Sequence, residues 1–133
     1  MNPSWAAEWL QRFSGTDPSS LIEMYADDVH FEDVALNRQV DGKVALREFF
    51  GDFMNPAARA NTFILVGYSG DTNGGAVEWI WKAVHRQAFL GIPALGKETT
   101  VKGVSVVTFQ GGKVFACHDY WDVRTVVQQL EAR

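Results

Sequence analysis

The stretch that decides the fold is Lys113–Asp122, which reads KVFACHDYWD. It follows a Gly111-Gly112 turn and alternates apolar with polar residues, as a strand with two unlike faces does. A period of two predicts that one face of this strand carries Phe115, Cys117, Asp119 and Trp121. Asp119 is the one charged residue on that face. Because a buried carboxylate is costly unless it is paired, protonated or used, Asp119 is the first candidate for a functional residue.

In the rest of the chain, the sequence pattern predicts mainly helices first and strands afterwards. Helical spacing of apolar residues indicates helices over 3–14, from Asp17-Pro18 through Tyr25, and from Asp41-Gly42 to Asn55-Pro56. Alternating or apolar runs indicate strands over 29–34, 62–69, 75–86 and 97–110, with a loop at 89–96 and a last helix over 124–131. This order is typical of an α+β fold, in which helices cover one face of an antiparallel sheet. If the sheet curls, a cone-shaped cavity remains between the two layers.

Length and composition exclude several classes of protein. The 133 residues predict one domain over 1–133, and a net charge of −4 without a basic cluster argues against a nucleic-acid partner. Since no apolar run approaches the length of a membrane span, we expect no membrane partner. The single cysteine excludes an internal disulfide and fits a cytoplasmic location. The three histidines do not stand at ligand spacing, so we expect no metal site and no cofactor.

Two families share parts of this sequence. Residues 21–33, followed by 42–50, resemble the amino half of the ketosteroid isomerase branch of the NTF2-like superfamily. Residues 89–97, followed by 101–105 and 118–122, resemble the SnoaL-like polyketide cyclase branch, and the last strand is also similar to limonene epoxide hydrolase. The resemblance implies an NTF2-like cone, in which a curved antiparallel or mixed sheet wraps around three N-terminal helices and a short C-terminal helix follows. This fold hosts isomerases, cyclases, dehydratases, hydrolases and non-catalytic binders.

The resemblance carries some functional residues across and not others. Asp33 matches the general base of the isomerases, and Asp119 matches the acid/base aspartate of the cyclases. The oxyanion donors of the isomerases fall near Trp9 and Ser105 here. His85 matches a histidine that is common in SnoaL-like chains. The arginine and one aspartate of the epoxide hydrolase fall on two tryptophans, Trp79 and Trp81.

The residues themselves support two readings of each candidate. A carboxyl group among indoles should have a raised pKa, which suits a general acid or base near neutrality, yet Asp119 could also be a hydrogen-bonded core residue. Asp33 could act in the same way or cap a turn. His85 could shuttle protons or anchor a loop. Trp79 and Trp81, two apart on one strand face, could wall a pocket for a flat ligand or fill the core.

Three functions therefore stay open. The first is a small, cofactor-independent enzyme in which Asp119, Asp33 and His85 act on an apolar, cyclic or polyketide-like carbonyl compound. Its expected pocket is lined by Trp9, Phe31, Trp79, Trp81, Val101, Ser105, Cys117 and Trp121. The second is a protein that binds a small molecule in the same cavity without catalysis. The third is an association domain, a homodimer through a convex sheet face with Ile80, Val84, Val104, Val106 and Tyr120.

Overall fold

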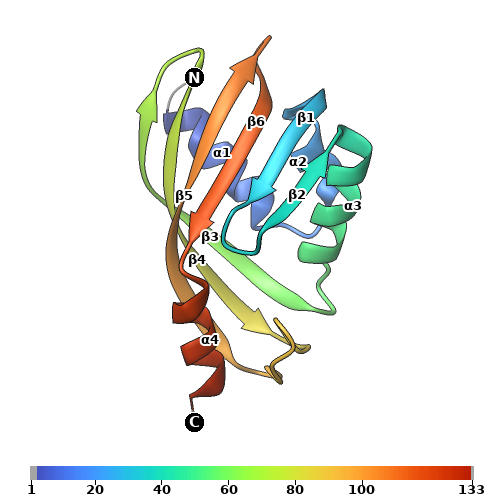
Figure 1. Ribbon diagram of the computed structural model, residues 1–133, viewed down its shortest axis with the longest axis vertical. Helices are drawn as coiled ribbons and strands as arrows, with labels where there is room; N and C mark the ends of the chain where they lie inside the picture. The colour runs from blue at the N-terminus through green and yellow to red at the C-terminus, as the bar shows by residue number, and fades with distance from the viewer. Residues whose placement is uncertain (1–2, 133) are drawn as a thin grey trace.

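The computed structural model describes residues 3–132, which form four helices and one six-stranded sheet (Figure 1). The helices are α1 (Pro3–Phe13), α2 (Pro18–Ile22), α3 (Lys43–Phe53) and α4 (Val123–Glu131). The strands are β1 (Tyr25–Asp33), β2 (Arg38–Asp41), β3 (Arg59–Gly70), β4 (Gly74–His85), β5 (Glu98–Gln110) and β6 (Lys113–Trp121). Their order in the sheet is β2-β1-β6-β5-β4-β3. The predicted α+β class and the cone of a mixed sheet around the N-terminal helices are confirmed.

The sheet is antiparallel except where β1 and β6 run side by side in the same direction. The first three helices precede most of the sheet in sequence: α1 packs on β3, and α3 packs on β1 and β2 (Figure 1). Their apolar stripes supply much of the core, because α1 buries Trp9 and Phe13 while α3 buries Leu46 and Phe50. The face of the sheet turned away from the cavity is called the outer face below.

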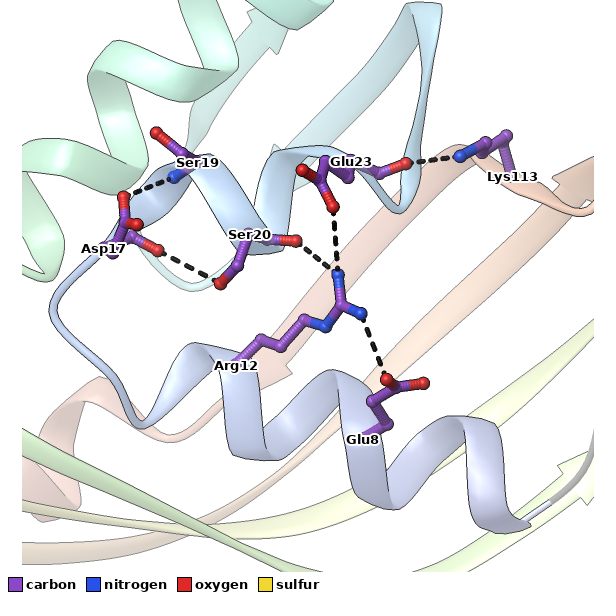
Figure 2. Close-up of polar contacts among 7 residues, drawn as sticks. All are labelled: Glu8, Arg12, Asp17, Ser19, Ser20, Glu23 and Lys113. Carbon is purple, nitrogen blue, oxygen red and sulfur yellow. Dashed lines mark hydrogen bonds and ion pairs between the residues drawn. The ribbon is translucent and has the colours of Figure 1, made fainter.

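Arg12 ties the two short N-terminal helices together (Figure 2). Its guanidinium donates to the backbone carbonyl oxygen of Ser20 at 2.5 Å and to the Glu8 carboxylate at 3.0 Å, and it lies 3.7 Å from the carboxylate of Glu23. Lys113 at the start of β6 donates to the carbonyl oxygen of Glu23 at 2.6 Å. These bonds hold the end of α2 against the sheet, where β1 begins.

The structure differs from the predicted elements at three places. Tyr25 was expected on the second helix, but α2 ends at Ile22 and Tyr25 opens β1, where its hydroxyl accepts a bond from the Trp9 indole at 2.9 Å. Strand β2 was not predicted, because only one of its four residues is buried. Phe115 was expected on the buried face of β6. A bulge between β5 and β6 shifts the register there, so Val114 is fully buried and Phe115 only partly.

Within residues 3–132 no helix is long and apolar enough to cross a membrane.

Candidate active site

The strand register places three polar residues in one row across the sheet. Asp33 on β1 is the neighbour of Asp119 on β6, and Asp119 is the neighbour of Ser105 on β5. Because neighbouring residues of paired strands point to the same face, all three side chains lie on the cavity side. The two aspartates are 86 positions apart in sequence, and the parallel pairing of β1 with β6 brings them together.

Asp119 is held by two hydrogen-bond donors on one of its oxygens. The Ser105 hydroxyl donates to Oδ1 at 2.6 Å, and the Cys117 thiol lies 3.4 Å from the same oxygen. Burial raises the pKa of Asp119 from 3.8 to about 7; the bond from Ser105 opposes the rise, whereas the nearby charge of Asp33 adds to it. Both of these bonds are made to Oδ1, and among residues 3–132 Oδ2 accepts no hydrogen bond.

Asp33 is buried and more fully bonded than Asp119. The indole N–H of Trp121 donates to its two carboxylate oxygens at 3.1 and 3.2 Å, and the backbone N–H of Leu36 donates to Oδ1 at 3.1 Å. Burial raises the pKa of Asp33, while these bonds lower it. The bond to Leu36 caps the turn after β1, as one of the two interpretations of Asp33 expected, and the same carboxyl group lines the cavity.

Trp79 completes a relay that ends on Asp119. Its indole N–H donates a hydrogen bond to the Ser105 oxygen at 2.9 Å, and the Ser105 hydroxyl donates one to Asp119. The ring reaches this position by lying over Gly103, its neighbour on β5. A Cβ atom at position 103 would overlap the six-membered ring of Trp79. Glycine at this site therefore sets where the indole lies.

We expect Gly103→Ala to lower the free energy of unfolding by about 1–3 kcal/mol, the usual cost of an overpacked core. The indole of Trp79 must move, and its bond to Ser105 is lost with the movement. Chemical denaturation measures the change. Gly67→Ala on β3 is the matched control, because a Cβ atom there meets nothing within 4 Å. Equal stabilities of the two variants would contradict the role of Gly103.

The cavity lies between the helices and the inner face of the sheet. Its volume is about 80 Å³, which is room for several waters or one small organic molecule. Its polar side chains are Asp33, Ser105 and Asp119. The rest of the wall is apolar or aromatic: Trp9, Leu10, Phe13, Phe31, Leu36, Phe49, Phe50, Phe53, Phe63, Trp79, Trp81, Phe89 and Trp121.

The structure does not bring every predicted residue to this wall. Val101 and Cys117 are buried and do not line the cavity. His85 is fully buried at the end of β4, outside the lining, with its Nε2 2.9 Å from the Thr99 hydroxyl oxygen. Burial and the charge of Arg59 lower the pKa of His85. Its Nδ1 has no partner among residues 3–132.

Sequence reasoning missed part of the aromatic wall. Phe49 and Phe53 belong to the stripe on α3 that indicated a core-facing helix, and three of its four residues, with Phe50, line the cavity. Both rings are only partly buried. Phe63 and Phe89 come from β3 and from a loop, and no periodicity singles them out. Leu36 comes from the turn that Asp33 caps. The width of the apolar stripe on α3 is the one sequence signal that could have suggested that this helix lines the cavity. A helix that faces both the core and a cavity has a wide apolar face.

The described side chains offer no set of nitrogen or sulfur ligands on the cavity wall. A group of metal-ligand type lies on the outer face instead, where His30, Glu32 and His118 come together. The histidines do not stand at ligand spacing in the sequence, and the pairing of β1 with β6 brings His30 and His118 together in the fold. Their ring centres are 5.7 Å apart.

Comparisons with known proteins agree on the family and the fold. The family described as SnoaL-like domain matches residues 6–117. A protein of ketosteroid isomerase-like fold from Catenulispora acidiphila, in complex with trimethylamine, is 15% identical with a TM-score of 0.82, over 100% of this chain and 96% of that one. A candidate polyketide cyclase from Xanthomonas campestris pv. campestris is 14% identical with a TM-score of 0.83, over 96% of each chain. An epoxide hydrolase of M. tuberculosis, similar to limonene epoxide hydrolase, is 14% identical with a TM-score of 0.74, over 94% of this chain and 86% of that one. Among curated proteins none matches.

Proposed function

The chain belongs to the SnoaL-like domain family, and from this premise we propose that it is a small, cofactor-independent enzyme of cyclase or isomerase type. It transfers a proton at a carbon next to a carbonyl group of an apolar, cyclic or polyketide-like compound. Asp119 is the general base, and Asp33 is the second acid/base group.

One observation carries the proposal: a carboxyl group with a pKa of about 7 faces an apolar cavity with one oxygen free. A base works best when its pKa lies near the working pH, because it is then both ionised and able to hold the proton. Ser105 and Cys117 hold Oδ1 of Asp119, which leaves Oδ2 to meet a C–H group. Asp33 is less suited to this step, since Trp121 and Leu36 already bond its oxygens.

Removal of a proton from the carbon next to the carbonyl group leaves an enolate. The negatively charged oxygen of this enolate needs a proton or hydrogen-bond donor. Trp9, Ser105 and His85 were the donors that the sequence suggested. The Trp9 N–H is bonded to Tyr25 and the Ser105 O–H to Asp119, while His85 lies outside the lining. We therefore assign the donor role to Asp33, the remaining polar group on the cavity wall. The donor is its protonated form, in the state of the pair in which Asp33 holds the proton and Asp119 is ionised.

The wall of the cavity supports an apolar, cyclic substrate. The rings of Trp81 and Phe63 stack at an interplanar angle of 13°, and Trp121 meets Trp81 edge-on at 5.7 Å. Flat hydrocarbon rings bind well in such walls because aromatic faces and edges pack against them. A charged or strongly polar substrate would lose its hydration here and gain few partners.

Hydrogen exchange next to a carbonyl group tests the proposal without a known final product. A panel of cyclic ketones and 1,3-diketones is incubated with the protein in D₂O, and deuterium uptake is read by mass spectrometry. We expect at least one compound to exchange faster with protein than in buffer. Compounds that quench the fluorescence of the cavity tryptophans but show no added exchange would contradict catalysis.

That second outcome describes the alternative function, a small-molecule-binding domain without catalysis. Its support is that four indole N–H groups along the cavity are already bonded inside the protein. Trp9 donates to Tyr25, Trp79 to Ser105, Trp81 to Asn61, and Trp121 to Asp33. A wall whose N–H groups are satisfied serves shape recognition of an apolar ligand well, and it leaves the carboxyl oxygens as the main polar contact.

We also propose that the protein is located in the cytoplasm. Its single cysteine is buried, as suits a reducing compartment.

We propose, in addition, that the protein is a homodimer. The outer face of the sheet carries exposed apolar side chains on adjacent strands, among them Val84, Val106 and Tyr120. Ile80 and Val104 lie between them and are partly buried. Exposed apolar side chains on the open face of a sheet are typical of an interface between two copies of a chain.

Light scattering is expected to report twice the mass of one chain, and Val106→Lys is expected to halve it. The substitution places a charge on the proposed interface, and a buried charge without a partner opposes association. Val44→Lys is the matched control, because Val44 is 80% exposed and lies on α3, away from this face. A wild-type mass of one chain would contradict the dimer.

A further inference from the structure

The outer face of the sheet brings together two histidines and a glutamate that the cavity chemistry does not use. One ligand atom from each of His30, Glu32 and His118 lies within 4.8 Å of the other two. All three residues are partly buried, with between 24% and 37% of each side chain exposed. Two imidazoles and one carboxylate are a usual set of protein ligands for Zn²⁺.

The strand register explains why these residues meet. His30 and Glu32 are two apart on β1 and therefore point to the same face. His118 on β6 is the direct neighbour of Glu32 in the parallel pair, and its Nε2 lies 3.7 Å from Oε1 of Glu32. Ligand atoms about 2.0–2.1 Å from a tetrahedral ion lie roughly 3.3 Å apart. Small side-chain movements would bring this group to that spacing.

Strand β2 supplies a partner for two of the three residues. The Asp41 carboxylate lies 2.5 Å from Nδ1 of His30, which leaves the other ring nitrogen available. Gln39 donates to Oε2 of Glu32 at 3.5 Å, while Oε1 faces His118. A carboxylate on the far nitrogen of a ligand histidine fixes its tautomer and orientation, as in many zinc sites. The cluster therefore has an outer layer as well as ligands.

We propose that His30, Glu32 and His118 bind one divalent transition-metal ion of the Zn²⁺ type on the outer face of the sheet. Three protein ligands leave a fourth position for water. Glu32 and His118 are the chain neighbours of Asp33 and Asp119, which point to the opposite face. An ion bonded to both strands at this level ties β1 to β6 where the two aspartates are aligned. Its role is structural: it stabilises the pairing that positions the cavity carboxyl groups.

Titration of tag-free, metal-stripped protein with Zn²⁺, followed by calorimetry, tests the site. We expect one ion per chain in the wild type and a rise in the melting temperature on binding. Glu32→Gln and His118→Asn should each weaken binding by roughly a hundredfold or more, since each removes a ligand. Glu78→Gln is the matched control, because it removes an exposed carboxylate from β4 on the same face and should leave binding unchanged.

Asp41→Asn tests whether the hydrogen bond between Asp41 and His30 contributes to Zn²⁺ affinity, as it should if the three ligands form a specific metal site. Loss of an outer-layer carboxylate should weaken Zn²⁺ binding by about 10- to 100-fold while the protein stays folded. Co²⁺ in place of Zn²⁺ adds a visible spectrum that reports the ligand set. Absence of one-to-one uptake by the wild type would overturn the proposal, and so would equal affinity in the wild type, Glu32→Gln and His118→Asn. The cluster would then be an ion-pair network.

Discussion

Asp119→Asn is expected to slow proton transfer by about 10²–10⁴-fold, the usual contribution of a positioned acid or base. Asparagine keeps the shape of the side chain but cannot take a proton from carbon. The measurement is the rate of deuterium uptake next to the carbonyl group, with the compound that the wild type exchanges fastest. Asp28→Asn is the matched control, because Asp28 is an exposed aspartate on β1. Full activity of Asp119→Asn would contradict the assignment of the base.

Two neighbours of Asp119 sharpen this test. The hydroxyl of Ser105 lowers the pKa of Asp119, so Ser105→Ala should move the acidic limb of the pH–rate profile to higher pH. The charge of Asp33 raises that pKa, so Asp33→Asn should move the same limb to lower pH, besides slowing the reaction. Opposite shifts of the pH–rate profile in these two variants are not expected if Asp119 is only a core residue.

The second large effect concerns stability. The pKa of Asp119 is about 7 in the folded protein and 3.8 without burial, so folding favours the protonated form. In the wild type this contribution is fully present below pH 4 and is lost as the pH rises towards 7. A difference of that size corresponds to up to roughly 4 kcal/mol of unfolding free energy. Asp119→Asn has no charge to bury, so it should gain stability relative to the wild type between pH 4 and pH 7.

Urea denaturation at pH 4.5 and pH 8 measures this difference. We expect the wild type to lose stability relative to Asp119→Asn over this interval, with the gap largest at pH 8. Comparison with the variant is needed because Asp33, whose pKa burial also raises, contributes a loss of the same sign to both proteins. The same pH dependence in Asp119→Asn and the wild type would show that Asp119 does not carry a raised pKa.

Together these two results would separate function from structure. A carboxyl group that costs stability at neutral pH and is needed for proton transfer is kept for its chemistry. A group whose removal lowers stability at every pH would be a structural part of the core. Functional sites commonly contain groups that are unfavourable for folding, because the charge or conformation is needed for the reaction.

Local patterns in the sequence are enough to locate most of the helices and strands and the inward face of most strands. Alternation along β6 placed Asp119 and Trp121 on one face and His118 on the other, and the structure agrees. Helical spacing located α1, α3 and α4 to within about two residues. These features are local: period two or 3.6 in the chain directly states which side chains share a face. The same logic failed at Phe115, because a bulge adds one residue and inverts the alternation beyond it.

The tertiary structure alone decided which residues meet. Asp33 lies beside Asp119, Trp121 bonds Asp33, and Trp79 reaches Ser105 over Gly103. On the other face, the same pairing of β1 with β6 joins His118 to Glu32. No local pattern reports a pairing between strands that are more than 80 residues apart. Such a pairing depends on the free energy of packing the whole sheet against three helices. Residues from the whole chain contribute to this free energy, so the pairing is seen only in the folded protein.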